Sequence, residues 1–317
     1  MRSSQLVISR IAWMIPMLFL VSVIAFLLIE MVPGDPARNS LGPDASDEAV
    51  EALREQWHLN EPLPVRYGIW ALGAIQGDFG VSMSTREPVL ETIFHRLPVT
   101  LSLALAAMVI AVTLGVVGGM LAGARIGSKV DRALNSLAGL VLSVPDFWVG
   151  LLIIALILQT KILPIPLQGY VPFERSPSEW LVHLILPGVT LALHPAAEIF
   201  RQTRASVSDV TGLDFVRTLK ASGVSRSHTL FAHIGKNSMV AVLAVLGLQL
   251  GLLLGHTAIV EMMFGMNGIG SLVAEAALNA DVVTIQGCVV VIAVFVLTMN
   301  LVIDVLYLYL NPRLRAK

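Results

Sequence analysis

Long apolar runs separated by polar segments dominate the pattern of this chain. A helix needs about 20 apolar residues to cross roughly 30 Å of hydrocarbon, because it rises about 1.5 Å per residue. Six runs reach or approach this length, at residues 11–31, 99–124, 137–158, 183–200, 239–260 and 284–310. The pattern therefore predicts an all-α polytopic membrane protein with six transmembrane helices.

Two of these runs have special features. The first follows Arg2 and Arg10, as in a signal peptide, but its apolar core is too long and no small-residue cleavage site follows, so we expect an uncleaved anchor. The fourth run is interrupted by polar and helix-breaking residues, which favours burial inside the bundle over contact with lipid. These residues are Pro187, His194, Pro195 and Glu198.

Composition supports a membrane protein and excludes other classes. Of the 317 residues, 56% are hydrophobic and only 14% are charged, whereas soluble domains carry about 25% charge. Mean hydropathy is +0.78. The net charge of −1 excludes a strongly basic nucleic-acid-binding protein. The single cysteine, Cys288, lies in an apolar run and excludes a disulfide scaffold.

The distribution of Lys and Arg predicts the orientation. With the N-terminus in the cytoplasm, 14 of the 21 basic residues fall on the inside and 7 on the outside, as the positive-inside rule requires. Both termini are then cytoplasmic. The resulting division is an N-terminal anchor at residues 1–32, an external helical segment at 33–98, a five-span core at 99–310 that includes a cytoplasmic segment at 201–237, and a cytoplasmic tail at 311–317.

The external segment contains one clear helix signal. Ser46 can cap a helix whose first turn is acidic, and Val50, Leu53 and Trp57 then form one apolar stripe. The segment can be a small helical cap on the outer membrane face, a docking surface for an external protein together with residues 168–180, or both. Its acidic face favours electrostatic steering, and it consists of Asp44, Asp47, Glu48, Glu51 and Glu55.

The cytoplasmic segment predicts a short helix over residues 214–222. Phe215, Val216 and Leu219 are expected on one side of it, and Gly223 ends it as a C′ glycine does. A second helical stretch is expected to begin near Ser225 or Ser227 and to run toward the fifth span. The short helix can be a passive connector or a knob that fits a groove in a cytoplasmic partner.

No catalytic, metal or cofactor motif occurs in the sequence. There is no His-Glu-x-x-His zinc motif and no Gly-x-Ser-x-Gly elbow. The dipeptide Gly235-Lys236 is followed by Asn237 and does not belong to a phosphate-binding loop. We therefore expect no catalytic residue, no metal ligand and no cofactor on this chain, and any nucleotide hydrolysis must occur on another chain.

Few ionisable residues fall within the predicted spans, and they include Asp146, His194, Glu198, His256 and Asp304. Glu198 and Asp304 lie near cytoplasmic ends, where they favour structural anchoring. Asp146 follows Pro145 and leaves two interpretations open. Its carboxylate can cap a helix restarted after the proline, or it can line a translocation path and attract a cationic group such as the terminal ammonium of a peptide.

Residues 214–224, Asp-Phe-Val-Arg-Thr-Leu-Lys-Ala-Ser-Gly-Val, resemble the EAA loop of the membrane subunits of ABC importers. This form of the loop is similar to that of dipeptide, oligopeptide and nickel permeases. Further stretches that match the same subfamily lie at residues 32–36, 77–82, 88–89, 97–101 and 311–313, so the resemblance covers nearly the whole chain. The short N-terminus and the long first external segment resemble the B-type subunit.

Two stretches depart from the family pattern. Residues 264–270, Phe-Gly-Met-Asn-Gly-Ile-Gly, keep the glycines of a motif that commonly contains Trp-Pro between them. Ser222 stands where a basic residue is common before the glycine of the EAA loop. Details of the family should therefore not be transferred to the turn at residues 264–270 or to the charge pattern of the EAA loop. The resemblance itself is not weakened.

The resemblance implies a type I ABC importer permease fold in a bacterial inner membrane, and a peptide-sized cargo. It implies as partners a C-type permease subunit, two ATPase subunits that bind ATP and Mg, and an external substrate-binding protein. It also implies that residues 214–222 form a coupling helix, with Phe215 and Leu219 in an ATPase groove and Arg217 and Lys220 paired with acidic residues. The coupling residues are then Asp214, Phe215, Arg217, Leu219, Lys220 and Gly223.

Alternative functions remain at this stage. A nickel or glutathione permease of the same family would share all of these features. An ion-coupled secondary transporter would use the intramembrane carboxylates instead. Such a carrier needs no docking site for an ATPase, so the long, capped cytoplasmic segment favours the ATP-driven importer.

Overall fold

The structure is a computed structural model, and it describes residues 3–30, 35–42, 44–160 and 165–310. Predictions for residues 32–34 and 311–313 lie outside the described residues. Within the described ranges the regular secondary structure is helical, apart from an isolated antiparallel bridge between Val81 and Pro88. This confirms the prediction of an all-α protein.

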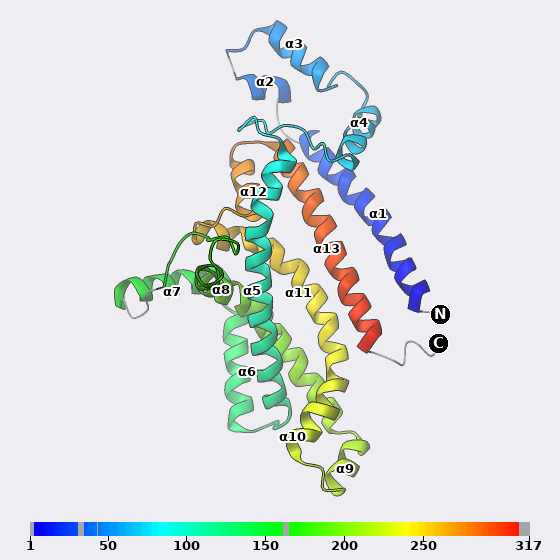
Figure 1. Cartoon of the computed structure of the whole chain (residues 1–317), viewed down its shortest axis with the longest axis vertical. Coiled ribbons are helices and arrows are strands. Elements are labelled where there is room, and N and C mark those ends of the chain that lie inside the picture. Colours follow the sequence, from blue (N-terminus) through cyan, green and yellow to red (C-terminus); the bar gives the residue numbers. More distant parts are fainter. Residues whose placement is uncertain (1–2, 31–34, 43, 161–164, 311–317) are drawn as a thin grey trace.

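Five of the described helices are long and apolar enough to cross a membrane. They contain all or most of the predicted spans one, two, four, five and six, and Figure 1 shows them as the central bundle. They are α1 (Ser3–Glu30), α5 (Val89–Gly123), α8 (Pro177–Thr211), α11 (Lys236–Met263) and α13 (Val282–Leu310).

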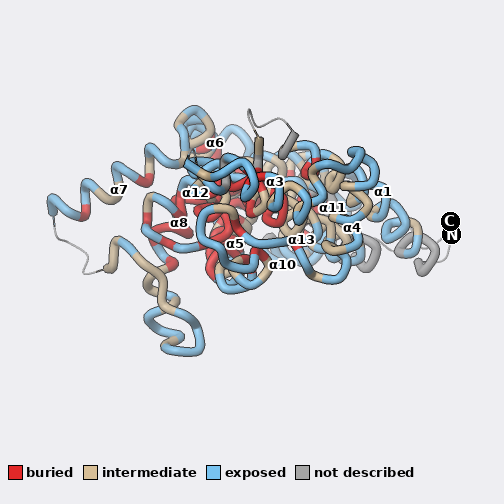
Figure 2. Tube along the Cα trace, turned by 90° about the horizontal axis from the view of Figure 1, so that it is seen from above, coloured by how far each residue is buried: buried red, intermediate tan, exposed pale blue. Residues whose placement is uncertain are grey.

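The third predicted span is broken. Instead of one helix over residues 137–158, the structure has α6 (Lys129–Leu142) and α7 (Asp146–Thr160), which meet at an angle of 101°. Pro145 explains the break, since proline lacks an N–H group and disfavours helical geometry in the residue before it. From this point α7 extends sideways from the bundle (Figures 1 and 2). The pair counts as a sixth span only if its two halves are taken together.

A seam of glycines joins α5 to α8. Gly115, Gly119 and Gly123 recur every four residues and face α8. A Cβ atom on Gly119 would lie 2.5 Å from the Cβ of Thr203, so a larger residue would force the helices apart. Small residues promote helix association in membranes because they allow backbones to approach closely. Of the five spans, α8 has the largest buried share, which confirms the prediction for the fourth run.

A buried ion pair ties α6 to the same helix. The Asp131 carboxylate is 2% exposed and accepts two hydrogen bonds from Arg204 of α8, from Nε at 2.5 Å and from Nη2 at 3.0 Å. It accepts a third from the N–H of Gly127 at 2.9 Å. The bidentate geometry satisfies the carboxylate and fixes the start of α6 against the middle of the bundle.

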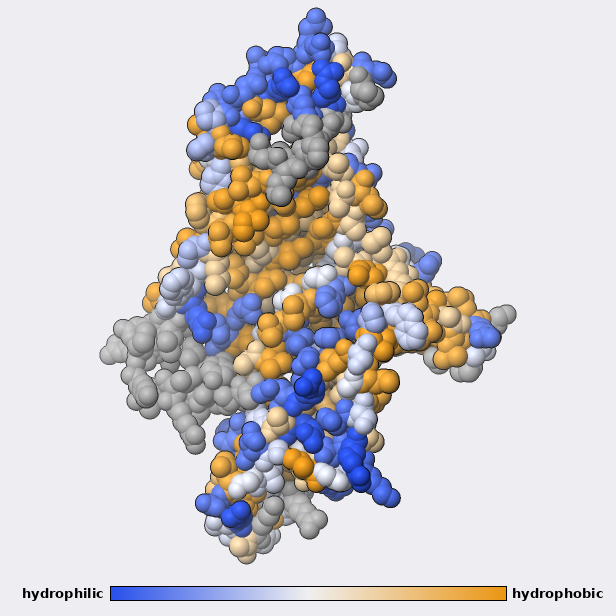
Figure 3. All heavy atoms as spheres, turned by 180° about the vertical axis from the view of Figure 1, so that it is seen from behind, coloured by the Kyte–Doolittle hydropathy of each residue, from blue (hydrophilic) through white to orange (hydrophobic). Residues whose placement is uncertain are grey.

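Three short helices form a cap at one end of the bundle: α2 (Pro36–Leu41), α3 (Asp47–Gln56) and α4 (Leu63–Ile75). The cap packs on α1 through Tyr67, whose ring meets Phe26 edge-on at 5.6 Å and whose hydroxyl lies 2.8 Å from Ser22 Oγ. Figure 3 shows a polar end over this cap, an apolar band beneath it and a second polar end opposite. This is the surface of a protein that crosses a bilayer.

The opposite end carries α9 (Asp214–Ala221) and α10 (Arg226–His228), followed by the π-helical segment η1 (Thr229–Gly235), which runs directly into α11. In Figure 1 this end lies far from α3. The polar linker between α11 and α13 contains a short apolar helix, α12 (Ile269–Leu278), that the sequence pattern did not predict.

Candidate functional site

Among the described side chains of α9, only that of Val216 is fully buried. It packs in a cluster with Met120 of α5, Val207 of α8 and Ile234 of η1. Phe215, by contrast, is 40% exposed, so the prediction that Phe215 and Val216 share one side is wrong. Successive helical residues point about 100° apart, and the bundle buries the valine rather than the phenylalanine.

The outward surface of α9 carries charge. Asp214 and Arg217 are highly exposed and form an i, i+3 pair at 3.4 Å. Such surface pairs contribute little to stability, so both groups remain available to a partner. Leu219 is half-buried, and the side chain of Lys220 lies outside the described residues. The exposed part of the helix therefore presents one aromatic ring and mixed charge.

Gly223 ends α9 as the sequence predicts. Its φ is +77°, in the left-handed region, and the N–H of Val224 donates to the carbonyl of Leu219 at 3.2 Å. This bond, from the second residue after the cap back into the last turn, belongs to a Schellman motif. Nothing lies within 4 Å of a Cβ built on Gly223, so the backbone conformation alone favours glycine here.

The chain after Gly223 forms a continuous connection to α11. The N–H of His228 donates to Ser225 Oγ at 3.4 Å, which confirms the predicted start of the second helix near Ser225. The π-helical turn η1 follows, and its Ile234 belongs to the cluster around Val216. Displacement of α9 would thus reach α11 through η1. Single π-helical turns inside α-helices are frequent at functional sites.

A cavity of about 380 Å³ lies at the break between α6 and α7. Asp146 lines it with a side chain that is 12% exposed, and its Oδ2 is 3.4 Å from Nδ1 of His256 on α11. The His194 ring of α8 lies 6.4 Å from the His256 ring. No backbone N–H in the described residues donates to Asp146, and the Trp148 N–H donates to the Pro145 carbonyl. The carboxylate therefore points toward α11 and does not cap α7.

A polar face of α8 continues from this cavity. His194, Glu198 and Gln202 follow at intervals of four residues and lie opposite the face that packs on α5. A second cavity of about 630 Å³ begins there, with both charged and neutral polar walls. Its lining residues are Asn135, Glu198, Arg201, Gln202, Arg204, Ala205 and Val245. Ionisable residues within spans usually face a bundle interior or a water-filled path, which suggests that this face does not contact lipid.

In the cap, α3 follows the prediction closely. Ser46 Oγ accepts the N–H of Ala49 at 3.3 Å, Val50 is 3% exposed, and Leu53 and Trp57 are half-buried. This confirms both the cap and the apolar stripe.

The two acidic residues singled out for docking differ in their contacts. Glu51 is engaged locally, since it accepts a hydrogen bond from Asn60 Nδ2 at 2.9 Å and pairs with Arg54 at 3.3 Å. Glu55 is exposed. Glu55 therefore presents its charge to solvent more fully than Glu51 does.

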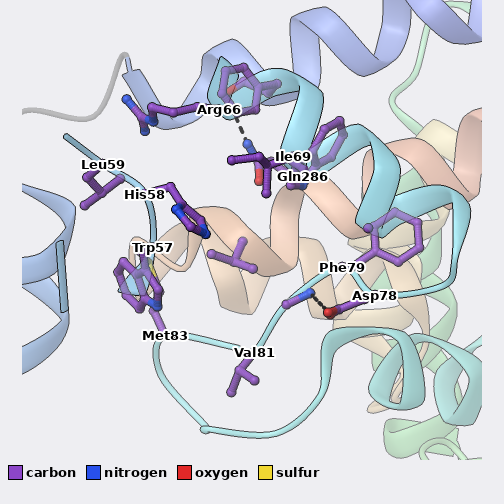
Figure 4. Close-up of a pocket in the computed structure, with 15 residues that line it drawn as sticks. Trp57, His58, Leu59, Arg66, Ile69, Asp78, Phe79, Val81, Met83 and Gln286 are labelled. Atoms are coloured by element: carbon purple, nitrogen blue, oxygen red, sulfur yellow. Dashed lines mark hydrogen bonds between the residues drawn. The ribbon is translucent and has the colours of Figure 1, made fainter. Parts of the chain in front are cut away.

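A pocket of about 250 Å³ lies between this cap and the bundle (Figure 4). Its walls are mostly aromatic or aliphatic, with Trp57, Ile69 and Phe79 among them. At its floor Gln286 of α13 is 1% exposed, and its Nε2 donates to the carbonyl of Phe26 at 3.1 Å. The bond fastens α13 to α1 beneath the cap.

Comparison with known protein families gives two matches that together span most of the chain. Residues 115–316 match the binding-protein-dependent transport system inner membrane component, and residues 4–104 match the N-terminal region of such membrane components. The chain belongs to this family. It is therefore a non-catalytic, multi-pass inner membrane permease of an ABC importer, and ATP is bound by separate ATPase subunits.

Individual relatives agree with this assignment. The permease is 39% identical over 310 residues to a protein of Sinorhizobium fredii described as a probable peptide ABC transporter permease, with 98% of each chain covered. It is 38% identical over 311 residues to the glutathione transport system permease of Escherichia coli K12, with 98% of this chain and 99% of the relative covered. Members of the family work with ATPase subunits and binding proteins.

Two buried carboxylates of the permease escaped the sequence analysis. Glu261 is fully buried at the end of α11 and accepts hydrogen bonds from Thr100 Oγ1 at 2.7 Å and from the N–H of Ser271 at 2.8 Å. It thereby joins α5 and α11 to the start of α12. A Cβ on Gly268 would lie 2.4 Å from the Glu261 carboxylate. This close approach explains why residue 268, within the stretch 264–270 that departs from the family pattern, is a glycine. We call these contacts the Glu261 clip.

Asp281 forms a second clip just before α13. It accepts hydrogen bonds from Ser82 Oγ at 2.5 Å, from Ser84 Oγ at 3.0 Å, and from the N–H of Met83 at 3.1 Å. Thr284 adds two more, from its N–H and its hydroxyl. Burial opposes ionisation of the carboxyl group, but these bonds outweigh it, so the pKa of Asp281 lies below its ordinary value. No sequence motif predicts this contact, because the residues that form it lie about 200 positions apart.

Among the described residues no group of three or more His, Cys, Asp or Glu side chains is arranged to hold a metal ion. The cluster of Asp146, His194 and His256 therefore does not form a metal centre of that kind.

Proposed function

We propose that this permease subunit moves small peptides across the inner membrane, together with a C-type permease subunit. The observation that carries the proposal is the pairing of an exposed, Schellman-capped α9 with a polar face of α8 that leads away from the Asp146 cavity. The first feature provides a place for a force-generating partner. The polar face of α8 provides a polar path through an otherwise apolar bundle, which a polar cargo needs.

The coupling step uses α9. ATP draws two ATPase subunits together, each ATPase carries its coupling helix with it, and the bundle opens toward the outside. In this mechanism Phe215 and Leu219 enter the ATPase groove, and Arg217 and Lys220 pair with acidic residues on its rim. Asp214 keeps Arg217 in place, and Gly223 sets the angle at which the helix leaves the chain.

The proposed orientation places α9 in the cytoplasm. The start of α1 and the end of α13 lie at the half of the bundle that carries α9, and the cap of α2–α4 lies at the opposite end (Figure 1). This arrangement, together with the excess of basic residues in the segments around α9, supports cytoplasmic termini. The cap then faces the external binding protein, with Glu51 and Glu55 on its acidic surface. Residues 168–180, which we include in the docking surface, lie further from α3 and pack beside α5, where Trp180 Nε1 donates to Ser102 Oγ at 3.1 Å.

Two other cargoes follow from the family. Glutathione is favoured by one of the relatives described above, and like a peptide it carries an ammonium group and carboxylates. Nickel is less well supported, because no group of three or more His, Cys, Asp or Glu side chains in the described bundle is arranged to hold a metal ion. Ion-coupled transport without an ATPase leaves the exposed α9 without a role.

The test is reconstitution. The chain should co-purify with a second permease and two ATPases, and vesicles containing the complex should take up peptides only with ATP and a loaded binding protein. Direct binding assays on that binding protein, with dipeptides, longer peptides, glutathione and nickel as ligands, would rank the cargoes. Uptake of peptide without ATP, driven by an ion gradient, would refute the proposal.

A further inference from the structure

The Asp146 cavity contains an unusual set of groups for the middle of an apolar bundle. Asp146 comes from the start of α7, His194 from α8 and His256 from α11, and these are the titratable groups among the residues that line the cavity. The other walls are mainly aliphatic or aromatic, with Phe147, Ile259 and Val260 among them. A carboxylate in such surroundings costs several kcal/mol unless a partner or water compensates it.

The partner that the structure provides is weak and movable. The distance of 3.4 Å between Asp146 Oδ2 and His256 Nδ1 lies at the long end for a hydrogen bond, and charge-assisted bonds are ordinarily shorter than 3 Å. The His256 side chain is 54% exposed, whereas that of Asp146 is 12% exposed. The imidazole is therefore free to swing away from a carboxylate that is itself held in place at the break after Pro145.

We propose that this cavity is a cargo subsite for a cationic group, in which Asp146 binds a primary ammonium and His256 is the partner that the ammonium displaces. The inference rests on the proposed function and deepens it, since it identifies which chemical group of the cargo the permease recognises. His194 lines the same cavity, with its ring 6.4 Å from that of His256. The polar face of α8, from His194 through Glu198 to Gln202, then leads the cargo onward to the second cavity.

The chemistry of the cavity selects a cation over the alternatives. An anion would meet an uncompensated carboxylate. A transition metal is not favoured, because no group of three or more His, Cys, Asp or Glu side chains among the described residues is arranged to hold a metal ion. An ammonium group needs only one close carboxylate and a few neutral acceptors. A peptide with a free amino terminus carries this group, and its acetylated form does not.

The test measures preference between two cargoes in one assay. Vesicles with the complete complex receive a free-amine peptide and its N-acetylated form, with different labels, both supplied as saturated binding-protein complexes. Only peptide pairs that the binding protein loads equally, by direct binding measurement, are used. The matched control is Asp209→Asn, which removes an exposed carboxylate from the end of α8, outside the cavity.

The variants should shift preference in opposite directions. The wild type should favour the free amine by about ten- to a hundredfold, the size of a charge-assisted hydrogen bond. Asp146→Asn should bring the ratio close to one. His256→Ala should raise the ratio above that of the wild type, because the competing imidazole is gone, and the double variant should behave like Asp146→Asn. Elution profiles and bound ATPase confirm that each variant is assembled.

Contrary results separate the possible failures. A wild-type ratio in Asp146→Asn, or equal slowing of both cargoes, overturns the cation subsite. A fall in the ratio for His256→Ala overturns the exchange and makes His256 a positioning residue. If the wild type moves neither peptide although it is assembled and hydrolyses ATP, the proposed peptide function fails, which is a different result from loss of preference.

Discussion

The two ends of this permease are fastened in different ways. At the end that carries the cap, the Glu261 clip and the Asp281 clip join segments far apart in sequence through buried carboxylates with several donors each. At the other end, α9 rests on the bundle through the buried side chain of Val216. Regions with few buried contacts open at lower free energy than regions with many.

This difference corresponds to what each end must do in the proposed mechanism. A helix that follows an ATPase must move as a body, and a helix with few buried side chains can shift at a lower free-energy cost than a segment held by many buried contacts. The segments around α12 and the start of α13 have to keep their shape while the spans beneath them move, and multiple directional hydrogen bonds enforce that shape. Mutations at α9 should therefore reduce transport more than stability, and mutations in the clips should do the reverse.

The largest effect should come from Gly223→Val. A β-branched residue is strained at a φ of +77°, by an amount on the order of 1–3 kcal/mol, so the chain would leave α9 at another angle. We expect ATP-driven uptake to be abolished while membrane insertion and assembly with the other subunits stay normal. Gly223→Asn is the matched control, since asparagine tolerates this region and should retain most uptake. Wild-type uptake by the valine variant would contradict the coupling role of α9.

The next effect concerns stability at the capped end. Glu261→Leu leaves the hydroxyl of Thr100 and the N–H of Ser271 without their acceptor, at about 1–3 kcal/mol for each buried group. We expect a clear drop in the melting temperature of the purified permease. Glu261→Gln retains one acceptor oxygen and should lose less. If Glu261→Leu is as stable as the wild type, the clip does not hold α12 to the bundle.

A smaller, pH-dependent effect should appear at the Asp281 clip. The pKa of Asp281 is lowered in the folded protein, so its contribution to stability is fully present above the unfolded pKa of about 4 and is lost as the pH falls through the lower, folded value. The difference in melting temperature between the wild type and Asp281→Asn should therefore be constant near neutral pH and shrink below about pH 4. A difference that grows on acidification would show that the bonds do not favour the ionised form.

The smallest effect should follow reversal of surface charge on α3. Replacing Glu51 and Glu55 by lysine should slow capture of the loaded binding protein by a few-fold at low salt, and the difference should vanish near 1 M salt, where the Debye length is about 3 Å. Because Glu51 is paired with Arg54, we expect Glu55→Lys to produce more of the effect than Glu51→Lys. Unchanged capture rates at low salt would remove the steering role of this acidic surface.

The positions of most helices, the cap at Ser46 and the helix end at Gly223 depend on residues close together in the chain, and they could be predicted from the sequence. Five of the apolar runs lie in continuous helices, Ser46 caps α3, and Gly223 ends α9 in the left-handed conformation. Each follows from helical periodicity, from a side chain that reaches a backbone N–H three residues away, or from the steric freedom of glycine. The proline that breaks the third run was also visible, although the 101° bend that it permits was not.

Only the tertiary structure decided which distant groups meet. The sequence showed Asp146 and His256 as separate ionisable residues, and folding across 110 positions brings them to one cavity. In the sequence Glu261 and Asp281 are acidic residues at the ends of the segment between the last two apolar runs, and nothing there indicates that α5 and the segment around Ser82 supply their hydrogen-bond donors. The physical reason is that a buried charge is stabilised by partners from other helices. The positions of those partners depend on packing, such as the glycine seam between α5 and α8, and not on local pattern.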